Sequence, residues 1–151
     1  LRFYVVGRSP APAVQALAND AIVVTGTVPD VRPYLQHAQV VVAPLRLARG
    51  IQNKILEAMA MARPVVASPS CANPIDAVPG QDLVIAETAE GYCTQISALL
   101  ASPGLADTIG AAARTRVLER YSWEANLSRI DPYLNRSSGQ ETGRGAAQPP
   151  R

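Results

Sequence analysis

Residues 50–68, GIQNKILEAMAMARPVVAS, decide the fold, because they predict a turn, a short helix and a buried strand in immediate succession. The helix is expected at 53–62, and its apolar side chains share one side of the helical wheel: Ile55, Leu56, Met59 and Ala60. Asn53 and Glu57 lie four positions apart on the other side, with Lys54 about 100° away. One side is therefore expected to pack, and the other to face a ligand or solvent.

The turn before this helix favours an anion. Gly50 lets the backbone approach a ligand closely, and the N–H groups of the first helical turn have no partner within the helix. These amides form the positive end of the helix dipole, which favours a phosphate. Glu57 lies one turn further along, where it is placed to accept two hydroxyl hydrogen bonds from a ribose. The alternative interpretation is a solvated helix carboxylate with Lys54 as its exposed neighbour.

Short apolar runs alternate with helical patterns over the first hundred residues. The runs expected to form strands are 3–6, 22–24, 40–43, 65–67 and 83–86. The segments with helical spacing between them are 13–18, 31–37, 53–62 and 88–100. This alternation predicts an α/β fold with a Rossmann-like parallel sheet, strands buried on both faces and helices on both sides.

The chain is expected to become wholly helical after residue 100. Ser102-Pro103-Gly104 predicts a break, followed by a helix over 105–120 and a last helix that Ser122 caps and that ends near residue 134. Residues 135–151 are rich in Ser, Gly, Gln, Pro and Arg, and predict a disordered tail. The expected organisation is thus one domain over 1–134 and a tail.

Length and composition agree with a single domain. A chain of 151 residues with 48% hydrophobic content is long enough for one core and short for two domains. It has no apolar run of about 18 residues and no charged-then-apolar leader, so we expect neither a membrane span nor a signal peptide. The chain begins at Leu1 and enters a strand directly, so we expect a fragment.

Charge and metal-binding residues argue against two classes of partner. The net charge is +2 and the arginines are scattered, which predicts no nucleic-acid interface. Cys71 and Cys93 lack a paired spacing and are expected to be free thiols in a reducing compartment. His37 is the single histidine and has no ligand partners in the sequence, so we expect a solvated side chain and no metal site.

Several motifs occur in order along the chain. They are GTVPDVRPY at 26–34, AQVVVAPL at 38–45, ILEAMA at 55–60, PVVA at 64–67 and YSWE at 121–124. Together they resemble the C-terminal, donor-binding half of GT-B glycosyltransferases of the group 1 family (family 4, retaining). The resemblance runs to about residue 134, and the sequence of residues 50–54 is similar to that of a bacterial exopolysaccharide-associated branch of the family.

The resemblance implies a function for the whole protein. It implies transfer of a sugar from a nucleotide diphosphate sugar to a glycan or lipid-linked acceptor, with retention and with neither metal nor cofactor. It places the reaction in the cytoplasm or at the inner face of the cytoplasmic membrane, in synthesis of exopolysaccharide or another surface polysaccharide. Because the acceptor-binding half is absent, we expect these residues alone to be inactive.

The resemblance also implies roles for residues around the expected helix. The family has two glutamates eight positions apart, and Glu57 matches the second, on the nucleotide ribose. Arg49 stands at the first, so the catalytic residue is unassigned, and Arg49 either reaches a diphosphate or points to solvent. The segment that matches the turn offering N–H groups to phosphate or hexose comprises Gly50, Ile51, Gln52, Asn53 and Lys54.

Two further loops belong to the implied site. Val28 matches the wall against which the nucleotide base lies, and Gly7 matches a tight turn toward the cleft. Arg8 follows Gly7, either as a ligand contact or as a surface arginine. By the same resemblance the chain lacks the first strand of the domain, which would lie centrally in the order 3-2-1-4-5-6. We therefore expect either a closed-up sheet or a neighbouring chain, such as a second copy, in the gap.

Other functions stay open at this point. A GT-B sugar phosphorylase or a nucleotide-sugar epimerase would share the half-domain. A degenerate domain that serves in binding or assembly is favoured by Arg49 in place of a glutamate. A dinucleotide-dependent dehydrogenase is disfavoured, because no G-x-G-x-x-G run follows a strand.

Overall fold

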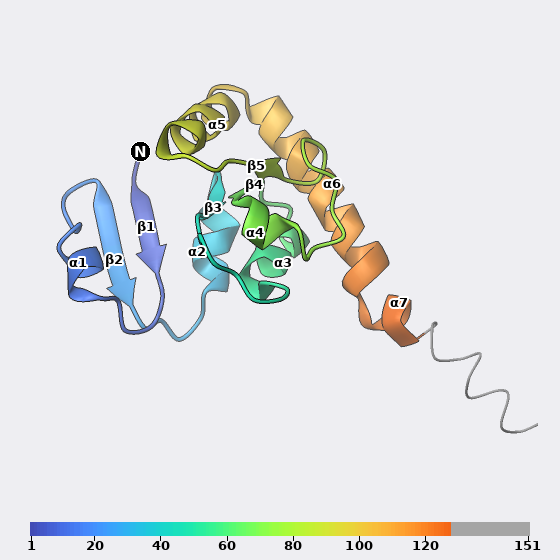
Figure 1. Cartoon of the computed structure of the whole chain (residues 1–151), viewed down its shortest axis with the longest axis horizontal. Helices are drawn as coiled ribbons and strands as arrows, with labels where there is room; N and C mark the ends of the chain where they lie inside the picture. Colours follow the sequence, from blue (N-terminus) through green and yellow to red (C-terminus); the bar gives the residue numbers. More distant parts are fainter. Residues whose placement is uncertain (128–151) are drawn as a thin grey trace, which may run out of the picture.

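The computed structural model describes residues 1–127, and Figure 1 shows how their elements are arranged. The strands are β1 (Phe3–Val6), β2 (Ile22–Gly26), β3 (Val41–Ala43), β4 (Val65–Ala67) and β5 (Val84–Ile85). The helices are α1 (Pro12–Gln15), α2 (Arg32–His37), α3 (Asn53–Ala60), α4 (Pro69–Ala72), α5 (Ala89–Ala101), α6 (Pro103–Tyr121) and α7 (Trp123–Leu127). The predicted end of the last helix and the predicted tail lie outside the described residues.

All the strand pairs are parallel, which confirms the predicted α/β class, but they form two sheets. β1 pairs with β2, and the second sheet has the order β3-β4-β5. No ladder joins β1 to β3 among the described strands, so the first of the two expected alternatives, a closed-up sheet, is wrong, and the second, a neighbouring chain in the gap, stays a prediction. In Figure 1 the β1–β2 pair, together with α1, stands to one side of the other elements.

The core is built around β4, whose three residues are fully buried. Val65 and Ala67 pack in one apolar cluster with Ile55 of α3, whereas Val66 packs in a second cluster with Leu99 of α5. Successive side chains of a strand point to opposite faces. The two clusters therefore lie on opposite faces of this sheet, and helices cover both, as predicted.

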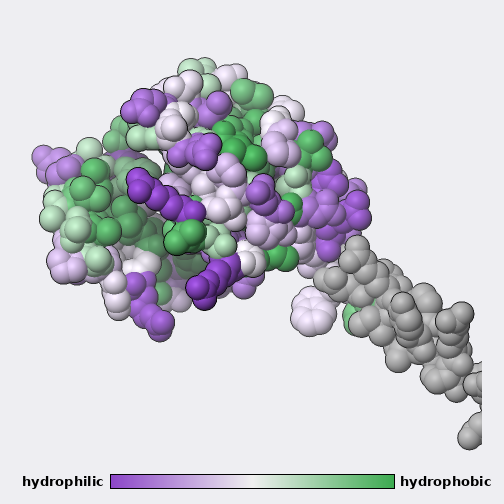
Figure 2. Space-filling view, in the orientation of Figure 1, coloured by the Kyte–Doolittle hydropathy of each residue, from purple (hydrophilic) through white to green (hydrophobic). Residues whose placement is uncertain are grey.

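The β1–β2 pair is less buried than predicted. Phe3 and Tyr4 are 48% and 46% exposed, and β2 is half-buried throughout, so the prediction of strands buried on both faces is wrong here. The Tyr4 ring lies 5.9 Å from that of Tyr34 in α2. Figure 2 shows hydrophobic residues gathered over this part of the surface.

The helix α6 packs against α3 and contacts the residues at its C-terminal end. Gly110 of α6 is buried against the carbonyl of Ala62, and Arg114 donates a hydrogen bond from Nη1 to the Ala60 oxygen. Ala62 has a left-handed backbone, with φ of 54°, so α3 ends at Ala60 and not at 62 as predicted. The contact fixes the C-terminal end of α3 and leaves its N-terminal end to the loop that follows β3.

Other boundaries differ from prediction by a few residues. Thr88 is the N-cap of α5, its Oγ accepting a hydrogen bond from the Gly91 amide at 3.1 Å, so the helix begins at Ala89, one residue later than predicted. The helix α6 begins at Pro103, two residues earlier than predicted, because proline has a suitable φ and lacks the N–H that the first turn leaves unpaired. The short helix α4 was not predicted, and α1 covers Pro12–Gln15 rather than 13–18.

None of the described helices is by itself long and apolar enough to cross a membrane. The helices α5 and α6 satisfy the length and composition test only as a pair, which is bent by 104°.

Candidate functional site

The loop after β3 and the start of α3 form the centre of the predicted site. Gly50 has a φ of +65°, a left-handed conformation that favours glycine, and a Cβ added there would meet nothing within 4 Å. Gln52 is the N-cap residue, and its side-chain Nε2 donates to the backbone carbonyls of Arg49 and Gly50, both at 3.3 Å. Its side chain therefore does not accept from the helix.

The backbone amides that lead into α3 have no hydrogen-bond partner among the described residues. Over residues 1–127, the backbone N–H groups from Ile51 to Lys54 donate no hydrogen bond, whereas Ile55 donates to the Gln52 carbonyl at 2.9 Å. Four donors thus remain at the positive end of the helix dipole, beside a residue that leaves space for a ligand. This arrangement has the chemistry of an anion site.

The two sides of α3 are divided as predicted. Ile55 and Met59 are fully buried, whereas Asn53, Lys54 and Glu57 are exposed. The fully buried Ala58 also belongs to the packing side, which is wider than the wheel suggested. In the described part of the chain the Glu57 carboxylate has neither an ion pair nor a hydrogen bond, so both of its oxygens are free to accept.

Arg49 lies in the same loop and is exposed. Its carbonyl accepts the Gln52 hydrogen bond, and among the described residues its guanidinium forms no ion pair. Both predicted roles, a diphosphate contact and a solvated side chain, stay predictions.

The remaining predicted residues follow β1 and β2. Gly7 and Arg8 are exposed in the loop after β1, and Val28 is half-buried in the loop after β2. Because all strands are parallel, these loops and the β3–α3 loop leave the sheets at carboxyl ends, and Figure 1 shows them on the same side of the molecule. Within residues 1–127, no hydrogen bond joins Gly7, Arg8 or Val28 to the α3 segment.

The turn that carries Val28 is fixed by Asp30. The carboxylate accepts hydrogen bonds from the backbone amide of Arg32 at 2.9 Å and from its Nε at 3.0 Å. The side-chain hydrogen bond from Arg32 lowers the pKa of Asp30 below its usual value. The Asp30 carboxylate therefore keeps its charge, which favours these hydrogen bonds, to a lower pH than an isolated aspartate would.

Sequence reasoning missed a group of hydroxyls beside the site. Ser68 and Ser70 donate from Oγ to the Leu45 carbonyl at 2.6 and 2.8 Å, and the Tyr92 hydroxyl donates to the Ala43 carbonyl at 3.3 Å. Burial raises the pKa of Tyr92, the Cys71 thiol acts in the same direction, and a hydrogen bond with Ser68 opposes both. The signal that could have shown this group is the serine that directly follows the buried strand β4.

The cysteines and the histidine lie outside this arrangement. Cys71 is buried and Cys93 exposed, and both are free thiols, as predicted. His37 is exposed at the end of α2. Residues 1–127 hold no group of three or more His, Cys, Asp or Glu placed to bind a metal ion.

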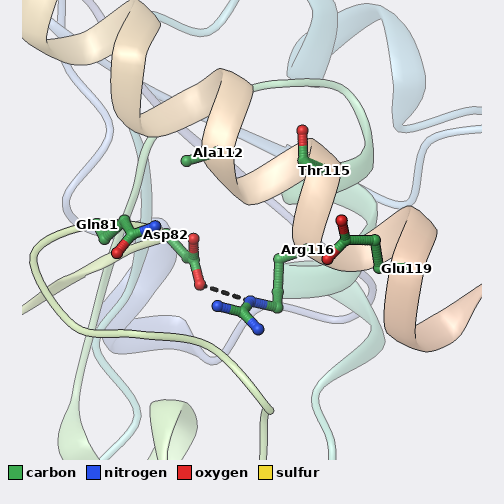
Figure 3. A pocket seen from close by; sticks show the side chains of 6 residues that line it. All are labelled: Gln81, Asp82, Ala112, Thr115, Arg116 and Glu119. Carbon is green, nitrogen blue, oxygen red and sulfur yellow. Dashed lines mark hydrogen bonds and ion pairs between the residues drawn. The ribbon is translucent and has the colours of Figure 1, made fainter.

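A second polar pocket lies against α6 (Figure 3). It is lined by Gln81, Asp82, Ala112, Thr115, Arg116 and Glu119. Asp82 is 2% exposed, and its Oδ2 accepts from Arg116 Nε at 2.8 Å and from the Val78 amide at 2.9 Å. This pair ties the turn before β5 to α6 and is structural.

The fold and the site together define a class. In nucleotide-binding domains with a parallel α/β fold, a strand is typically followed by a glycine-containing turn and then by the N-terminus of a helix. The chain belongs to the family described as "Glycosyl transferases group 1", which it matches over residues 1–102. Its fold is that of the C-terminal GT-B domain of such enzymes, as predicted. No curated protein sequence matches the chain.

Solved structures agree in fold. Sucrose-phosphate synthase from Thermosynechococcus elongatus aligns with a TM-score of 0.74 at 23% identity, over 90% of this chain and 39% of that one. HepE of Anabaena in complex with UDP aligns with a TM-score of 0.76 at 15% identity, over 90% and 41%. The C-terminal domain of the Francisella tularensis group 1 protein LpcC aligns with a TM-score of 0.63 at 21% identity, over 72% of this chain and 58% of that one. The chain thus spans about two fifths of the first two relatives.

Proposed function

We propose that the chain forms the donor-binding half of a retaining glycosyltransferase, which moves a sugar from a nucleotide diphosphate sugar to a glycan or lipid-linked acceptor. The observation that carries the proposal is the start of α3, where four unpartnered amides follow the left-handed Gly50 and precede the exposed Glu57 by one turn. Membership of the group 1 family supports it. So do the structures of HepE, which hold UDP and UDP-glucose.

Each part of this arrangement has a task in the proposed reaction. The amides from Ile51 to Lys54 bind the diphosphate and stabilise its charge as it leaves. The Glu57 carboxylate accepts hydrogen bonds from the two ribose hydroxyls, and Val28 lies against the base. Arg49 neutralises diphosphate charge from the exposed side of the loop.

A transfer assay tests the proposal. The full-length protein is incubated with UDP-, GDP- and ADP-linked hexoses and an acceptor extract, and released nucleoside diphosphate is measured alongside the anomeric configuration of the product. The proposal expects release with one nucleotide and a retained configuration. In a parallel incubation with added inorganic phosphate, release of sugar 1-phosphate from the glycans of the extract would instead indicate a phosphorylase, and conversion of the donor without release would indicate an epimerase.

The setting of the reaction is also proposed. The similarity of residues 50–54 to an exopolysaccharide-associated branch supports a role in surface polysaccharide synthesis, in the cytoplasm or at the inner face of its membrane. Residues 1–151 alone are proposed to be inactive, because catalysis needs groups from both sides of an interdomain cleft. The edges of β1 and β3 that no described strand pairs with are proposed to be covered by a further strand or by a second copy of the chain.

One observation favours a second candidate, a binding or assembly module without activity. Arg49 replaces the family's sugar-facing glutamate, and its exposed side chain has no carboxylate partner in the described residues. Such a module would retain nucleotide affinity or lose it, but it would release no nucleoside diphosphate. Replacing Arg49 with Glu separates the two: an enzyme in which Arg49 neutralises the diphosphate loses transfer, whereas an inactive module that lacks only this carboxylate gains it.

A further inference from the structure

The loop that carries the candidate site, residues 44–52, is anchored by few contacts. Leu45 and Ala48 pack against the core, whereas Leu47 is 92% exposed and both arginines of the loop are exposed. The hydrogen bonds formed within the loop are those from the Gln52 side-chain Nε2 to the backbone carbonyls of Arg49 and Gly50. Something outside the loop must therefore set its position.

Hydrogen bonds from outside the loop converge on one carbonyl. Ser68 Oγ lies 2.6 Å from the Leu45 oxygen and Ser70 Oγ lies 2.8 Å from it, with Cys71 Sγ at 3.9 Å. Ser70 Oγ also lies 3.3 Å from the Arg46 oxygen. Over residues 1–127, every hydrogen bond that reaches 44–51 from outside the loop comes from these three side chains.

Both positions need a hydroxyl group, because a methyl group of similar size donates no hydrogen bond. Each serine has one proton to donate, and the two hydroxyl oxygens lie 3.0 Å apart. Either both protons go to the Leu45 oxygen, which has two lone pairs, or one serine donates to the other and the second donates to Leu45. Ser68 is 8% exposed and cannot exchange its partner for bulk water at low cost. The backbone amide of Ser68 donates at 3.1 Å to the Ala43 carbonyl at the end of β3. The end of β4 thus holds the end of β3 and the first turn of the loop.

We infer that Ser68 and Ser70 are positioning residues for the donor site, a step that rests on the proposed function. By fixing the Leu45 carbonyl they set where the loop turns at Gly50, and hence where the amides from Ile51 to Lys54 meet a diphosphate. Neither serine touches the ligand. They hold the β3–α3 loop in the conformation that binds it, which lowers the entropy lost on binding.

The test uses Ser68→Ala, Ser70→Ala and the double variant in the full-length protein, with Ser70→Thr as the conservative variant and Ser97→Ala on the exposed face of α5 as the matched control. Backbone amide order parameters of the free protein are measured first by NMR relaxation, because the amides of 46–54 donate no hydrogen bond in the described residues and so have no exchange protection to lose. We expect lower order parameters over 46–54 in the double variant and unchanged values in β4. Unchanged order parameters in the loop would overturn the inference without any reference to a nucleotide.

Nucleotide titration is the second readout. The double variant is expected to raise the Kd of the nucleotide about tenfold, the loss of two neutral hydrogen bonds. Ser70→Thr is expected to restore most of the affinity that Ser70→Ala loses, and Ser97→Ala to change nothing. A wild-type protein that binds nucleotide and a double variant that binds it equally well, even with a lower Tm, would reduce the serines to a structural role. A wild-type protein that binds none would overturn the proposed function as well.

Discussion

Gly110 of α6 lies so close to Ala62 that a Cβ on the glycine would be 2.2 Å from the Ala62 carbonyl oxygen. The neighbour is backbone and cannot rotate away. Because Ala62 ends the segment that carries Glu57, this contact links the packing of α6 to the position of the candidate site.

Gly110→Ala is accordingly expected to destabilise the fold. The added methyl group must push α6 away from the end of α3, at a cost of about 1–3 kcal/mol in the free energy of unfolding. Urea unfolding measures it. Gly104→Ala on the same helix is the control, since a Cβ there meets nothing within 4 Å. Equal effects of the two substitutions would contradict the proposed role of the contact.

Gly50→Ala is expected to act through the backbone. A φ of +65° disfavours alanine by about 1 kcal/mol, although the space around Gly50 is open. The variant should lose nucleotide affinity in calorimetry because the loop shifts to relieve the strain. Gly50→Asn should retain more affinity than Gly50→Ala, since asparagine tolerates the left-handed region. The reverse order would indicate that ligand space, and not φ, requires the glycine.

Two ion pairs of the domain are expected to differ in importance. Arg116 pairs with Asp82, whose side chain is 2% exposed, whereas Arg120 pairs with Asp76, where both side chains are exposed. Removing Arg116 leaves a buried carboxylate without its cation, which is costly, while an exposed pair contributes little. Arg116→Met should therefore lower the urea midpoint clearly more than Arg120→Met. Similar midpoints for both variants would show that Asp82 is better solvated than its burial indicates.

Tyr92 gives the fold a dependence on alkaline pH. Burial, with the Cys71 thiol, raises its pKa above that in the unfolded chain, about 10. As the pH rises through 10, Tyr92 loses its proton in the unfolded chain before it does so in the folded one. The free energy of unfolding therefore falls between pH 10 and the raised pKa of the folded state. Unfolding free energies of wild type and Tyr92→Phe from pH 8 to 11 check this. The wild type should fall more steeply, and parallel curves would contradict it.

The sequence was sufficient for the elements that obey a local period. The run at 65–67 predicted β4 because three apolar residues between a proline and a serine suit a strand buried on both faces, and both clusters around it bear this out. The wheel of α3 separated Ile55 from Glu57 correctly for the same reason. The signals in these segments come from neighbours in the chain, which a sequence displays directly.

What the sequence could not show depends on distant contacts. The apolar runs at 3–6 and 22–24 look like buried strands, yet Phe3 is 48% exposed, and among the described strands β1 pairs with β2 alone. The convergence of Ser68 and Ser70 on Leu45 joins residues more than 20 positions apart. The meeting of Gly110 and Ala62 likewise has no local pattern.

The central claim is that Glu57 binds the ribose of a nucleotide held at the start of α3. Calorimetric titration of the full-length protein and its Glu57→Gln variant with UDP, GDP and ADP tests it most directly, with Asp107→Asn on the exposed face of α6 as the matched carboxylate control. We predict binding of one nucleotide, weakened about 10- to 100-fold by Glu57→Gln because hydrogen bonds to a charged acceptor are lost, and unchanged by Asp107→Asn. Equal affinity of wild type and Glu57→Gln would contradict the claim.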